Sequence, residues 1–175
     1  MNIFTKLGDK GFTSLQSGEK VRKDNYQIKV IGELDELNSH IGLLLSMIDD
    51  SHNKDFLYIL QNLLFDLSSS LFNNNNNFES HCLKIEHEID LMQTELPQLH
   101  FFILPGGCMA AAQAHICRSV CRRVERRVVS LTDNVSFNAS SIRILNRISD
   151  YFYILARKIN FVQGITEKKW QNTCE

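Results

Sequence analysis

A chain of 175 residues, 43% hydrophobic and 22% charged, has an ordinary globular composition and is long enough for one domain with a real core. Its formal net charge of -1 gives no overall attraction for nucleic acid or for a membrane surface, so any anion site must come from a local cluster. Only 2 prolines and 8 glycines interrupt the chain, which favours long helices.

The first segment, residues 1–24, is polar and predicts a loop or a short irregular hairpin. Its core, TKLGDKGFTSL at residues 5–15, is rich in glycine, lysine and hydroxyl side chains. Glycine allows backbone N–H groups to approach phosphate oxygens closely, and Lys6, Lys10 and Lys23 add positive charge. The Walker P-loop pattern is absent. Phosphate binding and a plain polar loop are therefore both open interpretations.

Three heptad-like apolar stripes follow and predict three helices that pack against one another. The first helix is expected from about Tyr26 to Ile48. The stripes are Leu34, Leu37, Ile41, Leu44 and Ile48; then Leu57, Leu60, Leu64, Leu67 and Leu71; then Cys82, Ile85, Ile89, Met92 and Leu96. The run from Asn73 to Asn77 predicts a solvated turn and is assigned no function.

Two carboxylates, Asp35 and Glu36, belong to the block GELDELNSHIG of the first helix. One interpretation places them near the start of that helix, where the helix dipole favours negative charge. The other is that one of them pairs with an arginine of another helix or of another subunit.

The segment FFILPGG, residues 101–107, breaks the pattern before a fourth helix that is expected from Ala110 to about Leu131. At about 100° per residue, Arg118, Arg122 and Glu125 share a narrow arc with Arg126 beside it. Two further arginines, Arg123 and Arg127, lie on another side. The apolar stripe between the two edges is Val120, Cys121, Val124, Val128 and Leu131. Because Glu125 is the only acidic residue here, surface salt bridging is a weaker explanation of these arginines than usual.

A fifth helix is expected from about Ser140 to Phe161, followed by a polar tail that should be frayed from Gly164 onward. Its apolar face is Ile142, Leu145, Ile148, Phe152, Leu155 and Ile159, and its polar face is Arg143, Asn146, Arg147 and Asp150. That polar face fits either a base or ribose contact or an ordinary solvated surface. The expected fold is all-α: one domain over residues 1–175, with an irregular N-terminal nucleotide-binding segment at 1–24, a five-helix bundle at 25–161 and the tail at 162–175.

Obvious catalytic machinery is missing from the sequence. The six histidines are scattered, without a Ser-His-Asp arrangement or the Glu-x-x-His pairs of di-iron proteins. The odd number of cysteines indicates reduced thiols, so Cys117 and Cys121 near His115 fit buried structural thiols better than zinc ligands. No leader and no apolar run of about 18 residues is present, so we expect a cytoplasmic protein without a membrane span.

Five sequence blocks in order resemble the trimeric class of ATP:cob(I)alamin adenosyltransferases, over the stretch from Thr5 to about Asn160. The blocks are TKLGDKGFTSL, KDN at residues 23–25, GELDELNSHIG, FILPGG with the CRRVERR helix, and LNRISDYFYILAR at residues 145–157. The resemblance implies a five-helix bundle, a homotrimer with its active site between adjacent subunits, and two small-molecule substrates, ATP and a corrinoid. The departures are small: Leu7 stands where threonine is frequent, and Asn25 replaces a common aspartate.

The resemblance also implies a role for individual residues. The ATP-binding residues would be Thr5, Lys6, Leu7, Gly8, Thr13, Lys23, Arg122, Arg126 and Asn146. Glu125 would lie near the phosphates and magnesium, and the pair Asp35 and Arg118 would form a salt bridge across the subunit interface. Phe102 would crowd the lower face of the corrin ring, with Phe101 left to the core. The expected catalytic residues are Arg122, Glu125, Arg126 and Phe102.

The implied reaction moves the 5′-deoxyadenosyl group of ATP to the cobalt of cob(I)alamin, with Mg²⁺ as cofactor. A reductase and an adenosylcobalamin-dependent enzyme are the further partners it suggests. One alternative is a non-catalytic corrinoid carrier or sensor on the same fold, which should bind no ATP. Another is a nucleic-acid-binding helical protein, which the net charge and the two-sided arginines argue against.

Overall fold

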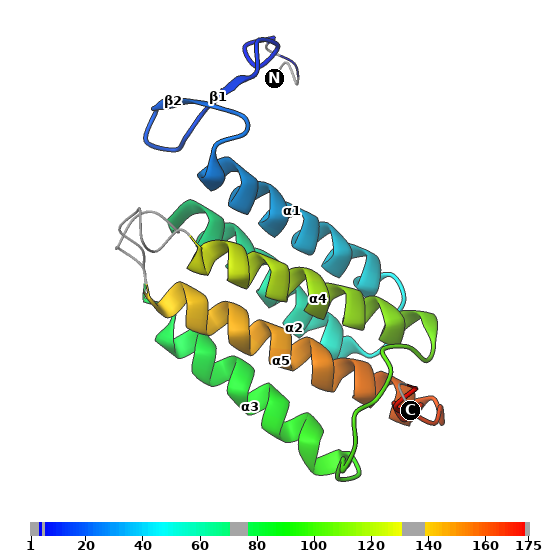
Figure 1. The fold of residues 1–175 in the computed structure, drawn as a ribbon. Helices are drawn as coiled ribbons and strands as arrows, with labels where there is room; N and C mark the ends of the chain where they lie inside the picture. Colours follow the sequence, from blue (N-terminus) through cyan, green and yellow to red (C-terminus); the bar gives the residue numbers. More distant parts are fainter. Residues whose placement is uncertain (1–3, 5, 71–76, 131–138, 174–175) are drawn as a thin grey trace.

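A computed structural model describes residue 4 and residues 6–70, 77–130 and 139–173. In this part of the chain the predicted helices are present, and Figure 1 shows them running alongside one another. They are α1 (Tyr26–Leu45), α2 (Ser51–Ser70), α3 (Glu79–Glu95), α4 (Met109–Val129) and α5 (Ala139–Val162). The predicted positions Thr5, Leu71, Leu131 and most of the asparagine run lie outside the described residues.

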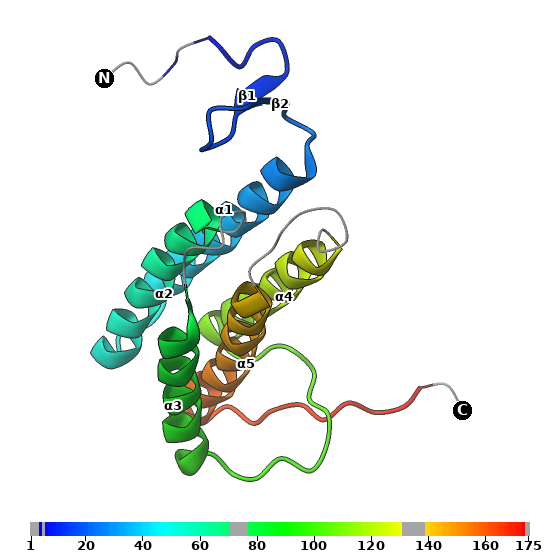
Figure 2. The same ribbon diagram turned by 90° about the vertical axis from the view of Figure 1, so that its left-hand side faces the viewer.

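The helices are arranged so that α4 and α5 form the centre of the bundle. Helix α4 packs against α1 and α5, α5 packs against α3, and α1 packs against α2 (Figures 1 and 2). The predicted stripes supply the core: Leu34, Leu37, Ile41, Leu57 and Ile85 each expose 2% or less of their surface. Complete burial of such a side chain stabilises a fold by about 1.5–3 kcal/mol, so the heptad spacing accounts for the packing of the bundle.

The N-terminal segment forms a short hairpin, which is one of its two expected forms. Strands β1 (Phe12–Ser14) and β2 (Lys20–Arg22) pair antiparallel with Thr13 opposite Val21. The side chain of Asn25 then accepts a hydrogen bond from the Gln27 N–H at 2.8 Å and caps the start of α1. Both ribbon views show the hairpin projecting beyond that end of α1, away from the bundle.

Two predictions about chain placement were wrong. Asp35 and Glu36 lie in the middle of α1, because the helix begins at Tyr26, about two turns before them. The tail is not frayed from Gly164: the Leu104 N–H donates to the Lys168 carbonyl at 2.8 Å, and Ile103 forms a bridge with Lys169. Polar composition indicated a solvated end, but backbone pairing orders this stretch.

Among the helices of the described residues, none combines the length and the apolar character that crossing a bilayer requires.

Candidate functional site

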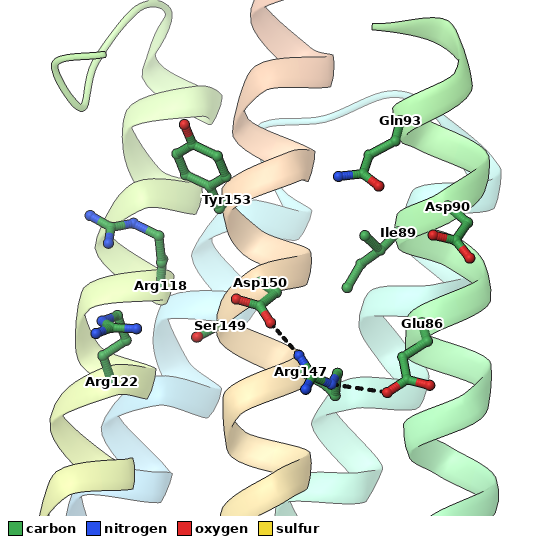
Figure 3. Close-up of a pocket in the computed structure, with 10 residues that line it drawn as sticks. All are labelled: Glu86, Ile89, Asp90, Gln93, Arg118, Arg122, Arg147, Ser149, Asp150 and Tyr153. Atoms are coloured by element: carbon green, nitrogen blue, oxygen red, sulfur yellow. Dashed lines mark hydrogen bonds and ion pairs between the residues drawn. The ribbon is translucent and has the colours of Figure 1, made fainter. Parts of the chain in front are cut away.

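A charged pocket of about 430 Å³ lies between α3, α4 and α5 (Figure 3). Figure 3 shows Arg118 and Arg122 on successive turns of α4, beside the helix α5 that carries Asp150 and Tyr153. The full lining is Glu86, Ile89, Asp90, Gln93, Arg118, Arg122, Arg147, Ser149, Asp150 and Tyr153. The pocket therefore joins one of the two basic edges of α4 to the polar face of α5.

The two basic edges of α4 differ in their partners. On one edge Arg123 pairs with Glu36, and Arg127 lies 3.3 Å from Glu33, so α1 supplies the carboxylates that α4 lacks. Salt bridging therefore does explain this edge, contrary to expectation. On the other edge, no carboxylate of the described residues lies within ion-pair distance of the arginines, which are Arg118, Arg122 and Arg126.

The local electrostatics of the unpaired edge favour an anion. Burial lowers the pKa of Arg118, and the neighbouring charge of Arg122 lowers it further. Burial also lowers the pKa of His115 to about 4, with Arg118 as the second cause, so this imidazole is neutral at pH 7. An incoming anion would relieve the repulsion between the arginines, which makes this edge the stronger candidate for binding a polyphosphate.

The structure brings Glu125 and Asn146 together. Asn146 Nδ2 on α5 donates to Glu125 Oε1 on α4 at 3.2 Å. The polar face of α5 is otherwise engaged with carboxylates, because Arg147 lies 2.9 Å from Glu86 and donates to Asp150 at 2.6 Å. The ion pairs show that this face is not a plain solvated surface, and they leave only part of it available to a ligand. Asn146 links the face to α4, the helix that carries the arginines.

The hairpin gathers the expected N-terminal ATP residues, apart from Thr5, which lies outside the described residues. Lys23 packs beside Gly8, where an added Cβ would stand 3.0 Å from Lys23 Nζ. Lys6 adopts a positive φ of 57°, and Leu7 is 81% exposed. Thr13 is half-buried on β1. Within the described chain this group lies beyond the end of α1, and it does not meet the pocket of α3, α4 and α5 (Figures 1 and 2).

Asp35 and Arg118 also stay apart within one chain. Asp35 is exposed on α1, and the part of the chain that is described gives it no ion-pair partner. Arg118 makes only a 3.4 Å contact with the Ser119 hydroxyl, and its Nε is buried without a partner among the described residues. Each residue therefore has a charge that the described part of the chain leaves unpaired.

Phe102 lies outside the core, with 80% of its surface exposed, and its expected contact with a corrin ring stays a prediction. The prediction that Phe101 belongs to the core was wrong, because 42% of its surface is exposed. It lines a surface cavity with Arg157 and Phe161 instead. How deeply either ring is buried depends on which distant segments lie against it, and the sequence of residues 101–107 does not contain that information.

The turn after Phe102 is held by Asn160 of α5. Asn160 Nδ2 donates to the Gly106 carbonyl at 2.9 Å, and Asn160 Oδ1 accepts from the Cys108 N–H at 3.2 Å. Gly107 has a φ of 112°, and a Cβ there would lie 2.0 Å from Asn160 Oδ1. Only glycine fits both the backbone conformation and the space, so the PGG turn is fixed against α5.

Sequence reasoning did not single out several residues that line the pocket. Tyr153 lies three residues after Asp150, so the helical period that grouped the polar face of α5 extends to it. Glu86 and Asp90 are four apart on α3 and face the pocket together. The same spacing argument would have found these residues.

Cys117 and Cys121 behave as structural thiols. Burial raises the pKa of Cys117 to about 12 and raises that of Cys121 well above its ordinary value. Cys121 Sγ donates to the Leu145 carbonyl at 3.2 Å. The described residues contain no cluster of three or more histidine, cysteine or carboxylate side chains that could hold a metal by themselves. These observations favour buried thiols over a zinc site.

Comparison with known proteins gives consistent matches. The family model described as "Cobalamin adenosyltransferase" matches residues 3–159. A cobalamin adenosyltransferase of Cupriavidus metallidurans is 40% identical, over 99% of this chain and 96% of that protein. A human corrinoid adenosyltransferase is 37% identical, over 95% and 72%. The solved structure of a variant PduO-type ATP:corrinoid adenosyltransferase from Lactobacillus reuteri, complexed with cobalamin and ATP, aligns with a TM-score of 0.92 at 30% identity, over 98% of this chain and 100% of that one.

Proposed function

The chain belongs to the cobalamin adenosyltransferase family, and on that basis we propose that it transfers the 5′-deoxyadenosyl group of ATP to the cobalt of cob(I)alamin. The main support for a triphosphate site is the unpaired arginine edge of α4, formed by Arg118, Arg122 and Arg126. Three cations on consecutive turns, without a described carboxylate partner, suit an anion that carries several charges, such as a triphosphate.

In this reaction the electron pair of cobalt in the +1 state forms the bond to C5′ of ATP. The bond from C5′ to oxygen breaks, and its electron pair leaves with the triphosphate. The nucleophile belongs to the corrinoid substrate, which agrees with the lack of a protein nucleophile in the sequence. The contribution of Arg122 and Arg126 is to stabilise the negative charge that grows on the leaving triphosphate.

Glu125 fits a magnesium ion that travels with ATP. Only Oε1 of Glu125 is engaged, by Asn146, and its side chain is accessible beside the arginine edge. Magnesium is usually held by one or two carboxylates together with substrate phosphates, so a single carboxylate here is sufficient. When bound, the ion would add positive charge against the triphosphate, while Asn146 keeps the Glu125 carboxylate in place.

We propose that the ATP site is completed between subunits of a homotrimer. The hairpin of β1 and β2, which Gly8 precedes and Lys23 follows in the sequence, lies beyond the end of α1 and away from the pocket of its own chain. A two-stranded hairpin is marginal alone and gains stability by packing on another surface. The unpaired Asp35 and Arg118 would complete one another across that contact.

Phe102 is proposed to meet the lower face of the corrin ring. Its exposed aromatic ring, shortly before the turn that Asn160 fixes, offers a flat apolar surface to a flat macrocycle. An aromatic ring at that face would keep the lower axial position of cobalt empty and make the +1 state easier to reach. The four cysteines within the described residues are free thiols, in keeping with a reducing, cytoplasmic setting, where a reductase would supply the electrons.

The test is a spectral assay with chemically reduced cobalamin, ATP and magnesium. The proposal expects the cob(I)alamin absorption to give way to that of adenosylcobalamin, with one triphosphate released per turnover. Isothermal titration with ATP alone separates this from a corrinoid carrier on the same fold, which should give no nucleotide heat.

A further inference from the structure

The C-terminal tail pairs with the segment that carries Phe102. The Trp170 N–H donates to the Phe102 carbonyl at 2.8 Å, and the Leu104 N–H donates to the Lys168 carbonyl at 2.8 Å. Between these bonds, Ile103 and Lys169 form an antiparallel bridge. Figure 2 shows the tail (red) crossing the connection between α3 and α4 (green). The backbone on both sides of Ile103 is thereby fixed by chain that is more than 60 residues distant.

The guanidinium of Arg157 on α5 binds both segments, the C-terminal tail and the connection between α3 and α4. Its Nε donates to the two carboxylate oxygens of Glu167 in the tail at 3.1 and 3.2 Å. Its terminal nitrogen donates to the Pro97 carbonyl at 3.0 Å, at the start of the connection after α3. The Arg157 side chain is only 7% exposed. A buried charge of this kind depends on its partner, so loss of the Glu167 carboxylate should release the tail.

The Phe102 ring has little packing of its own, since 80% of its surface is exposed. The neighbouring ring of Phe101 is different, because the Lys169 ammonium lies 5.4 Å from its centre and Arg157 shares its cavity. The direction of the Phe102 ring therefore depends on how its backbone is held. That backbone is held by Trp170 on one side and, beyond the PGG turn, by Asn160.

We propose that Arg157 and Glu167 are positioning residues for the corrinoid substrate. They hold the tail against residues 102–104 and so fix Phe102 where the macrocycle meets it. This inference rests on the proposed function. The group acts through Phe102 and touches neither the arginine edge nor the hairpin, so it should affect the corrinoid and leave ATP binding unchanged.

The first test uses Glu167→Gln in the full-length chain. Because Trp170 is the only tryptophan, its emission reports the tail directly, and we expect a shift to longer wavelength together with faster amide exchange at Leu104. The KM for cob(I)alamin should rise between about tenfold and 100-fold, as expected when a reacting surface is misplaced, while the KM for ATP stays constant. Glu95→Gln is the matched control, since Glu95 pairs with Lys158, the residue next to Arg157, without touching the tail.

A second variant tests the same pairing in case Glu167→Gln fails to fold. Trp170→Pro removes the N–H that bonds to the Phe102 carbonyl and leaves Arg157 and Glu167 intact, whereas Trp170→Phe keeps that N–H. Trp170→Pro should raise the KM for cob(I)alamin, and Trp170→Phe should not. In a Phe102→Ala background, both Glu167→Gln and Trp170→Pro should have no further effect on corrinoid kinetics.

The outcomes separate the two proposals. Absence of adenosylation by the wild-type chain overturns the proposed function and this inference with it. Normal wild-type turnover, combined with a released tail and an unchanged KM for cob(I)alamin, overturns this inference alone. The positioning role is equally overturned if Glu167→Gln raises the KM for ATP to the same extent, or if its effect persists undiminished in the Phe102→Ala background.

Discussion

Asn146 Nδ2 donates to Glu125 Oε1 at 3.2 Å, and this bond ties the one carboxylate of α4 to α5. Without that bond, Glu125 could turn toward an arginine on its own helix, since residues three or four apart on a helix are neighbours. The amide thus keeps the carboxylate and the arginines apart, so that both can face a ligand. Each arginine can therefore be altered without releasing the carboxylate.

Arg122→Ala should remove most of the activity while the fold stays intact. Loss of one charge-assisted contact to a leaving triphosphate should cost on the order of 2–4 kcal/mol at the transition state. Steady-state kinetics and a thermal melt measure the two effects. Arg123→Ala is the matched control, because the adjacent arginine is already paired with Glu36. Near-normal turnover of Arg122→Ala would place the triphosphate elsewhere.

Exchanging the charges of Asp35 and Arg118 tests the subunit contact. Arg118→Asp puts two carboxylates at the proposed interface and should shift the trimer toward smaller species, measured by light scattering at micromolar concentration. The double variant Asp35→Arg with Arg118→Asp restores opposite charges and should recover the trimer. A wild-type preparation that is fully active as a monomer would contradict the assembly.

Phe102→Ala should leave the melting temperature nearly unchanged and keep ATP binding, because its ring is mostly solvent-exposed. It should strongly slow adenosylation and remove the spectroscopic signature of four-coordinate cobalt(II). Phe101→Ala serves as the contrast, with a loss of about 1–2 kcal/mol of stability, less than for a fully buried ring. If Phe101→Ala gives the catalytic defect instead, the two rings have been assigned in the wrong order.

Gly107→Ala should destabilise the protein by at least about 2 kcal/mol, since it adds backbone strain and a clash with Asn160. Gly106→Ala is the natural control, because a Cβ at Gly106 meets no atom within 4 Å and its φ is not in the left-handed region. Urea titration of the two variants measures the difference. Equal stabilities would show that the turn relaxes at no cost.

The free energy of unfolding should depend on pH because of His115. Its pKa is lowered to about 4 by burial and then by Arg118, so between pH 4 and 6.5 the unfolded chain binds a proton that the folded chain does not. Stability should therefore be complete above pH 6.5 and fall by about 3 kcal/mol as the pH drops toward 4. His115→Gln should flatten this slope in urea titrations, and the exposed His87→Gln should not. A slope unaffected by His115→Gln would assign the effect to carboxylates.

The bundle could be predicted from sequence because its buried positions recur with the helical period, as Leu34, Leu37 and Ile41 show. The expected start of the first helix at Tyr26 was also right, and the Asn25 side chain that caps it is a local signal for that start. Because that start already puts Asp35 well inside the helix, the interpretation of Asp35 as a helix-start residue could have been rejected from the sequence.

Other features could not be predicted, because they depend on contacts between distant segments. The partners of Arg123 and Arg127 come from α1, so the composition of α4 alone gave the wrong expectation. Pairing of the tail with residues 102–104 has no periodic signature, since backbone groups of any sequence can make it. The surroundings of Phe101 also come from distant residues, since Lys169 and Arg157 lie beside its ring, and its exposed fraction was missed as well.

The contact between Gly107 and Asn160 also restricts how this protein can diverge. The carboxamide of Asn160 occupies the volume that any side chain at Gly107 would need. A descendant that exchanges the glycine must already have shortened residue 160, and in doing so it gives up the bonds to Gly106 and Cys108. Such a lineage passes through an intermediate in which the turn after Phe102 is loosened. The two positions are therefore expected to change together or to stay as they are, although 52 residues separate the hydrogen-bonded Cys108 from Asn160 in the sequence.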